Sequence, residues 1–185
     1  MPSVGIGKKP VLSDFVKLPL LDDGARNWLR RKKVPDDVFR GWPGPIVKTK
    51  IATSGDRFEL DPGGEMAFVH PVWYDQLDVE DFVAWRPKEP ARWWTADGAE
   101  LMGGGYLTDA AAEGWPLVFQ DTPLDWLVSY GCGVCVLDWT IGRLAVLSCA
   151  EECGVYAQSR KQGEDLQRRL AHTPTPPVEI SIARR

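Results

Sequence analysis

The chain has 185 residues, 44% of them hydrophobic, and a formal net charge of −4. This length and composition suit one domain of ordinary size or two small ones, and they argue against wholesale disorder. No apolar run approaches the roughly 20 residues that a membrane-spanning helix needs, and the N-terminus lacks a signal-peptide pattern. We therefore expect a soluble, cytoplasmic protein with no membrane partner.

Charge is distributed unevenly along the chain. Residues 26–50 carry a net charge of +6, residues 51–156 carry −13, and residues 157–185 carry +3. The acidic middle is unlike a surface that binds nucleic acid, whereas the basic flanks suit one.

The first predicted elements are two short helices. Asp22 or Asp23 can cap a helix near residues 24–33, with Trp28 on its inward face, and a second short helix is expected over 35–39. The outward face of the first helix is basic and comprises Arg26, Arg30, Arg31, Lys32 and Lys33. Two interpretations stay open: these cations contact phosphate, or they form a solvated face that favours the helix C-terminus.

A region of strands and turns follows. Five stretches predict strands, namely residues 46–52, 57–60, 66–72, 81–86 and 92–95. The turn residues at 61–64 (Asp-Pro-Gly-Gly) are a strong hairpin signal. The glycine triplet at 103–105 lacks a following lysine and helix, so it is not a phosphate loop. We expect it to act as a hinge that divides the chain into residues 1–105 and 106–185.

The last part of the chain alternates between the two kinds of element. Strands are predicted at residues 116–121, 134–137, 154–157 and 178–182, with helices after Thr122 and over 141–150 and 163–171. This alternation indicates βαβ units and a mainly parallel sheet.

Two of these helices carry more detailed predictions. Thr122 is the expected N-cap of its helix, with a proline at the first position and Asp125 at the capping-box spacing. In the helix over 141–150, the spacing of Ile141, Leu144 and Leu147 predicts that all three face inward.

Two runs stand where a site would lie, after the first and third of these strands. They are Asp121-Thr122-Pro123-Leu124-Asp125-Trp126-Leu127 and Gln158-Ser159-Arg160-Lys161-Gln162-Gly163. In spacing and order they resemble the Glu-Gly-x-x-Asp-Ala-Leu and Asp-x-Asp-x-x-Gly motifs of the Toprim domain of primases, topoisomerases and related nucleases. The resemblance covers residues 116–185, and the preceding helical and antiparallel segments are similar to the region that leads into Toprim in phage and plasmid primases.

This resemblance implies a fold and a set of site positions. The expected fold class is mixed, α+β or α/β: N-terminal helices and a small antiparallel β region, followed by a Toprim-like parallel α/β sheet. The site positions are Asp121, Asp125, Gln158, Arg160 and Gly163. In the family, acidic residues at such positions bind a divalent metal, and a glutamate serves acid–base chemistry.

The chemistry of these positions departs from the family pattern. Mg²⁺ prefers carboxylate oxygens, whereas Gln158 offers one neutral oxygen and Arg160 is a permanent cation that repels the ion. The resemblance therefore implies a degenerate site with no catalytic residue, no metal and no cofactor. The simpler interpretation of the acids is structural, with Asp125 capping its helix and Asp138 ending a strand.

Three functional hypotheses follow from these observations. The first is a non-catalytic protein of a phage or mobile element that binds nucleic acid or a replication or host protein. The second is a divergent magnesium-dependent DNA primase or nuclease that uses Asp121 and Asp125. The third, motivated by the acidic middle of the chain, is an interaction protein that inhibits a host nucleic-acid system.

Other residues with metal-binding or stacking chemistry favour structural roles. Cys132, Cys135, Cys149 and Cys153 have a spacing that resembles a zinc site. Because Cys135 falls in an apolar strand and Cys149 at a helix end, free thiols are favoured over zinc, and a disulfide is the third alternative. The adjacent Trp93 and Trp94 could stack on bases or fill the core.

Overall fold

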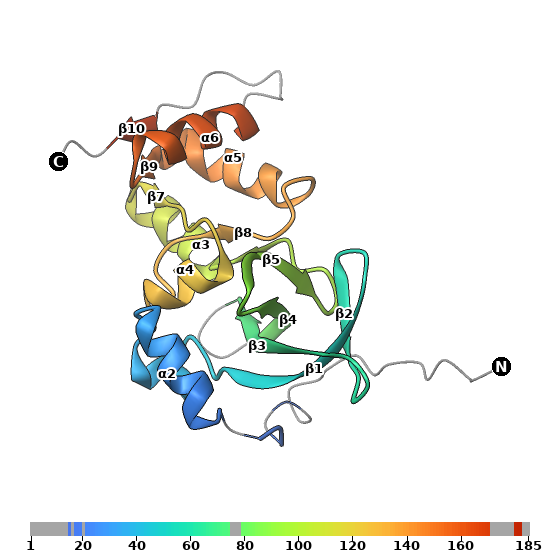
Figure 1. The fold of residues 1–185 in the computed structure, drawn as a ribbon. Helices are drawn as coiled ribbons and strands as arrows, with labels where there is room; N and C mark the ends of the chain where they lie inside the picture. Colours follow the sequence, from blue (N-terminus) through green and yellow to red (C-terminus); the bar gives the residue numbers. More distant parts are fainter. Residues whose placement is uncertain (1–14, 16, 20, 75–78, 171–179, 183–185) are drawn as a thin grey trace.

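The protein has a mixed α/β fold (Figure 1). The structure is a computed structural model that describes residues 15, 17–19, 21–74, 79–170 and 180–182. Helix α2 and a β-barrel occupy the lower half of the view in Figure 1, and the C-terminal helices α5 and α6 lie at the top. Within the described residues, no helix is both long and apolar enough to cross a membrane.

Both N-terminal helices form where the sequence predicts them, and the first is capped by Asp22, one of its two predicted caps. Helix α2 (Asp23–Arg31) begins after Asp22, whose carboxylate accepts a 2.6 Å hydrogen bond from the Ala25 N–H. A 3-10 helix, η1 (Asp36–Phe39), follows it. Trp28 packs against Phe68 and Trp85 of the barrel, with ring centroids 5.5 and 5.9 Å away. The predicted inward face of α2 is confirmed.

Five strands close into a barrel in the order β1-β2-β5-β4-β3. They are β1 (Val47–Ser54), β2 (Arg57–Leu60), β3 (Glu65–Trp73), β4 (Val79–Arg86) and β5 (Glu89–Thr95). Neighbouring strands are antiparallel except β2 and β5, which are parallel. The five predicted strands are confirmed, but they form a closed barrel rather than an open antiparallel region. Closure pairs every strand on both edges and so leaves no free sheet edge.

The hairpin predicted at residues 61–64 is wrong. Strands β2 and β3 do not pair with each other, because they flank β1: Ile51 is opposite Leu60 on one edge and opposite Glu65 on the other. The turn therefore carries the chain from one edge of β1 to the other without reversing it. A Cβ atom on Gly64 would lie 2.1 Å from the Ile51 carbonyl oxygen, so the glycine permits this close crossing.

The C-terminal strands are short and only partly parallel. Strand β7 (Leu117–Val118) is parallel to β9 (Val155–Ala157), which is parallel to β10 (Ile180–Ile182). Strand β6 (Leu101–Met102) is antiparallel to β8 (Cys135–Val136), and an isolated parallel bridge between Phe119 and Val134 links the two sheets. The predicted parallel pairing is present, but the large parallel sheet is not seen among the described residues. Residues 178 and 179 of the predicted last strand lie outside the described residues.

Four helices accompany these strands: α3 (Gly104–Glu113), α4 (Pro123–Val128), α5 (Gly142–Cys153) and α6 (Arg160–Leu170). The predicted cap of α4 is confirmed, because the Thr122 hydroxyl accepts a 3.1 Å hydrogen bond from the Asp125 N–H. Helix α3 was not predicted. It begins within the glycine triplet at 103–105, so the prediction that no helix follows these glycines is wrong.

Gly103 and Gly133 allow three segments to approach closely. Both have positive φ, +84° and +90°. A Cβ atom on Gly103 would lie 2.3 Å from the Gly133 carbonyl oxygen, and one on Gly133 would lie 2.5 Å from the Val118 carbonyl oxygen. The start of α3, the approach to β8 and the end of β7 therefore pack backbone to backbone. The division of the chain at residue 105 stays a prediction.

The predicted inward face of the helix over 141–150 is wrong at two of its three positions. Leu147 is buried, but Ile141 is 51% exposed and Leu144 is 64% exposed. Helix α5 instead buries Val146, Leu147, Cys149 and Ala150. The helix carries apolar residues on more than one side, so a three-residue spacing did not identify the side that the fold covers.

Candidate nucleic-acid interface

A cluster of side-chain amides lies at the carboxyl ends of β7 and β9, where ligands bind in many α/β folds. The Gln162 side-chain amide donates hydrogen bonds to the Phe119 carbonyl at 3.2 Å and to the Asp121 carboxylate at 2.9 Å. Its oxygen accepts a 2.8 Å bond from the Gln158 N–H. The Gln120 amide donates to the Cys132 carbonyl at 2.9 Å. These polar groups largely satisfy one another.

The structure brings together only part of the predicted site. Gln162 connects Asp121 to Gln158, so these two positions are close. Asp125 remains in the helix cap, bonded to the Thr122 hydroxyl at 2.6 Å. The Arg160 side chain is 85% exposed and pairs with Glu164 at 2.8 Å along α6.

The fifth predicted position, Gly163, is buried in the first half of α6, and its N–H donates to the Ser159 carbonyl at 3.0 Å. Gly163 thus contributes to the helix itself. The structure shows no metal-ligand chemistry at this position.

The described residues offer amides and thiols rather than a set of metal ligands. Among them, no group of three or more histidine, cysteine, aspartate or glutamate side chains gathers closely enough to hold a metal ion. The Cys149 and Cys153 sulfurs are 3.5 Å apart on α5, Cys132 is exposed and Cys135 is buried. Burial raises the pKa of Cys149 to about 12 and also raises that of Cys135, so both side chains are neutral thiols at pH 7.

Beside the amide cluster, Trp139 lies in the wall of a series of hollows. One hollow of about 270 Å³ includes Trp93, Asp121 and Gln162 in its walls. Next to it lies a second hollow of about 600 Å³. We call this second space the Trp139 hollow; it is lined by Trp139, Thr140, Arg143, Asp165, Arg168 and Arg169.

The Trp139 ring contacts the buried core through Phe119 and the surface through Arg169. Phe119 is buried, and its ring is stacked on Trp139 with centroids 6.3 Å apart. The exposed Arg169 guanidinium lies 4.9 Å from the Trp139 ring centroid. Arg168 pairs with Asp165 on the same helix. Three arginines against one aspartate give the hollow a positive balance beside an aromatic plane.

Sequence reasoning missed this hollow. Trp139 comes three residues after the end of β8, and Arg168 and Arg169 stand in the last turn of α6. The position of Trp139 after a strand end was an available signal. Its proximity to arginines about 30 residues further along the chain was not visible in any local pattern.

The adjacent Trp93 and Trp94, for which base stacking and core packing were both open, have different environments. Trp93 is half-buried in the wall of two hollows and donates a 3.1 Å hydrogen bond to the Leu137 carbonyl. Trp94 is only 2% exposed, and the guanidinium groups of Arg86 and Arg92 lie 4.8 and 5.1 Å from its ring centroid. Trp94 therefore belongs to the barrel core, and Trp93 borders the candidate interface.

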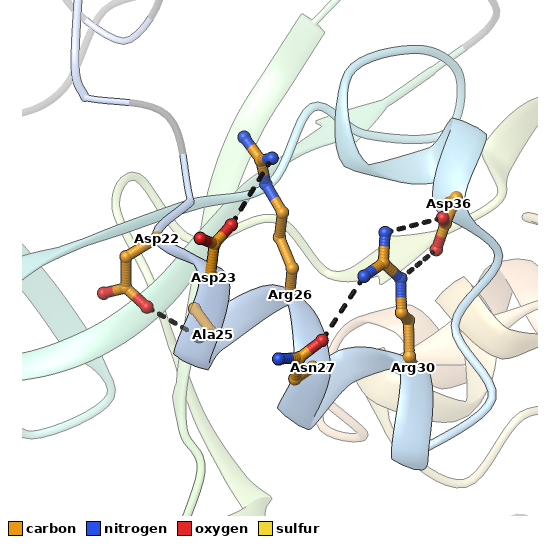
Figure 2. Close-up of polar contacts among 7 residues, drawn as sticks. All are labelled: Asp22, Asp23, Ala25, Arg26, Asn27, Arg30 and Asp36. Atoms are coloured by element: carbon orange, nitrogen blue, oxygen red, sulfur yellow. Dashed lines mark hydrogen bonds and ion pairs between the residues drawn. The ribbon is translucent and has the colours of Figure 1, made fainter.

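The basic face of α2 is largely engaged within the chain (Figure 2). Arg30 donates to both carboxylate oxygens of Asp36 at 2.8 Å, which raises the pKa of Arg30 and lowers that of Asp36. Arg26 lies 3.9 Å from Asp23, and Lys32 lies over the Trp28 ring. Lys33 and Arg31, both exposed, complete the predicted phosphate-binding set.

Comparisons with known proteins do not identify a family for this chain, so a functional proposal rests on the geometry. Searches against family models, curated proteins and solved structures give no match for this chain. The resemblance to Toprim domains therefore enters only as a proposal. Two candidate interfaces remain for experiment, the Trp139 hollow and the basic face of α2.

Proposed function

We propose that the protein is a non-catalytic, Toprim-like binding protein of a phage or mobile element, and that it binds single-stranded nucleic acid at the Trp139 hollow. One observation carries this proposal. A tryptophan and three arginines share one open hollow next to the carboxyl ends of the parallel strands. The hollow thus combines the two kinds of group that single strands require.

The arrangement favours unpaired bases over duplex. Bases in single strands can stack on an aromatic ring or on the plane of a guanidinium group, whereas bases in a duplex are already stacked. Trp139 supports the guanidinium of Arg169 from the core side, because its ring also contacts Phe119. A base would stack on this supported plane, and Arg143 and Arg168 would contact the neighbouring phosphates.

The amide cluster supports the non-catalytic part of the proposal. Metal-dependent nucleotidyl transfer needs carboxylates that converge on a divalent ion. Here the Gln162 side chain accepts a hydrogen bond from the Gln158 N–H and donates one to Asp121, while Asp125 is held in the cap of α4. The nearest polar groups to the hollow are therefore suited to shaping a loop rather than to activating a nucleophile.

Fluorescence anisotropy with a labelled 20-nucleotide oligo-dT at low salt tests this proposal. We expect Trp139→Ala to weaken binding by about 1–3 kcal/mol, because it removes the stacking support. Trp115→Ala, at a tryptophan that is 51% exposed elsewhere, is the matched control and should leave affinity unchanged. Absence of binding by the wild-type protein, or equal losses in the two variants, would contradict the proposal.

Salt dependence tests the phosphate contacts separately. Each phosphate contact on a single strand contributes about −0.7 to the slope of log K against log salt. Replacing both Arg143 and Arg168 by alanine should therefore reduce the slope by about 1.4. An unchanged slope would show that these side chains do not contact phosphate.

The enzyme hypothesis makes a distinct prediction. A primase or nuclease that used Asp121 would show magnesium-dependent strand synthesis or cleavage, abolished in Asp121→Ala. We expect neither activity with the purified protein in millimolar Mg²⁺. Activity that disappears in that variant would replace the present proposal.

A further inference from the structure

Another hollow lies between α3 and α5, and it shares no lining residue with the Trp139 hollow. It has a volume of about 420 Å³, and its apolar walls include Leu101, Leu107, Ala111, Ala145 and Cys149. Helices α3 and α5 pack side by side here. We call this space the α3–α5 groove.

An uncovered apolar strip on α5 extends this groove. Ile141 is 51% exposed and Leu144 is 64% exposed, and Ala145 is exposed as well. The spacing of these positions, together with Ser148 in the groove wall, places them on one side of the helix. Ile141 and Leu144, two of the three residues whose spacing predicts a buried face, thus form with Ala145 an apolar surface that nothing in the described chain covers.

The border of the groove is acidic. Glu80, Glu100 and Glu152 line it, and no lysine or arginine is among those of its lining residues that the structure describes. Helix α3 also contributes Asp109 and Glu113 and contains no basic residue. Burial raises the pKa of Glu80, and the neighbouring Asp81 and Glu100 raise it further, which indicates that these carboxylates experience one another's charge.

We propose that the α3–α5 groove binds a basic amphipathic helix of a partner protein. An apolar floor between two helices accepts the apolar side of a third helix, and acidic side chains at the border attract lysine or arginine on its flanks. A nucleic acid does not fit this surface, because the border would repel phosphate. A second copy of the chain in a two-fold interface would place like acidic borders against each other. This site is independent of the nucleic-acid site.

Binding of a labelled 18-residue leucine/lysine amphipathic helix to the full chain tests the proposal. We expect this peptide to bind at least about tenfold more tightly than a scrambled peptide of the same composition. Leu144→Asp should weaken binding by about tenfold, because it places a charge in the apolar contact. The control Met66→Asp, at an exposed residue of β3, should have no effect.

A charge-matched pair separates the groove from general attraction to an acidic protein. Glu152→Lys in the groove should weaken peptide binding severalfold, whereas Glu59→Lys on β2 makes the same change in net charge and should not. Trp139→Ala should leave peptide binding intact, so failure of the nucleic-acid proposal would not affect this result. Equal effects of the two glutamate variants would overturn the proposal, as would a homodimer in solution that Leu144→Asp dissociates.

Discussion

The barrel and the elements from β6 to β10, which we call the C-terminal module, are stabilised in different ways. The barrel strands are four to nine residues long and pair on both edges, so continuous backbone hydrogen bonding defines their positions. The strands of the C-terminal module are two or three residues long. There, close glycine contacts and side-chain amides join segments that backbone pairing alone would hold weakly.

This difference determines where the candidate sites lie. Short strands leave loops and helix ends free to carry Trp139, Gln162 and Arg169, and these residues form hollows beside the barrel. Trp93 of β5 belongs to the wall of the same hollow, so the barrel supplies a rigid side for a site built mainly by loops and α6. The following predictions test how the two regions are joined and how each is stabilised.

The largest effect is expected at the joint between the two regions. Asp81 of β4 is 4% exposed and accepts hydrogen bonds from the N–H groups of Phe82, Asp97, Gly98 and Ala99, at 2.7 to 3.0 Å. Asp81→Ala leaves these donors without their acceptor and should lower the free energy of unfolding by about 4 kcal/mol in urea titrations.

Asp61→Ala is the matched control for that change. Asp61 accepts one 2.8 Å hydrogen bond, from the Gly63 N–H in the turn between β2 and β3. Its loss should cost about 1 kcal/mol or less. Equal destabilisation by the two variants would mean that Asp81 does not organise the segment that leaves the barrel.

A pair of glycine substitutions compares the two regions directly. Gly133→Ala places a Cβ atom 2.5 Å from the Val118 carbonyl oxygen at a positive φ, and should destabilise the protein by about 3 kcal/mol. Gly55 in the barrel turn also has a positive φ but no atom within 4 Å of the added group, so Gly55→Ala should cost about 1 kcal/mol. Thermal unfolding of both variants measures the difference, and a smaller effect at Gly133 would refute the close-contact account.

Histidine 70 makes barrel stability depend on pH. His70 is fully buried, which lowers its pKa from 6.5 to about 4. The unfolded chain therefore binds a proton that the folded chain does not between these pH values. The free energy of unfolding contributed by this residue is constant above pH 6.5 and falls by up to about 3 kcal/mol as the pH drops to 4.

Urea titrations from pH 7 to 4 test the role of His70. The raised pKa of Glu80 acts in the opposite direction, because the folded state then binds more protons as the pH falls toward the ordinary glutamate range. The lowered pKa of Asp36 adds acid sensitivity only below its ordinary value of 3.8. His70→Leu should therefore remove most of the loss between pH 6.5 and 4.5, and an unchanged pH profile would show that the residue is solvated.

The smallest effect concerns the cap of α4 in the C-terminal module. Thr122→Ala removes the acceptor for the Asp125 N–H and should cost about 1 kcal/mol in thermal unfolding. Thr122→Ser keeps the hydroxyl and should cost much less. If both variants lost the same stability, the methyl group rather than the cap would be responsible.

Local patterns predicted the local structure well. Thr122 was identified as a cap, and Asp22 as one of two candidates with Asp23, because a short polar side chain before an apolar helical face satisfies free N–H groups. The five barrel strands followed from turn residues and strand propensity. Closure of the barrel did not, because it depends on the pairing of β1 with β3 and of β2 with β5, which no local pattern relates.

The candidate site was predictable only in part, for the same reason. Asp121 and Gln158 follow strand ends, so their proximity could be expected from a parallel arrangement. The contact between Trp139 and Arg169 depends on how α6 packs beside the loop after β8. The outward direction of Leu144 likewise depends on which side of α5 the fold covers, and helix periodicity does not determine that side when several sides are apolar.

The central claim is that nucleic acid binds at the Trp139 hollow and not on α2. The most direct measurement compares the affinity of labelled oligo-dT for Trp139→Ala and for the double variant Arg31→Ala/Lys33→Ala at one low salt concentration. We predict a loss of about fivefold or more for the first and less than about twofold for the second. The reverse order, with the α2 variant losing affinity and the Trp139 variant binding normally, would contradict the account.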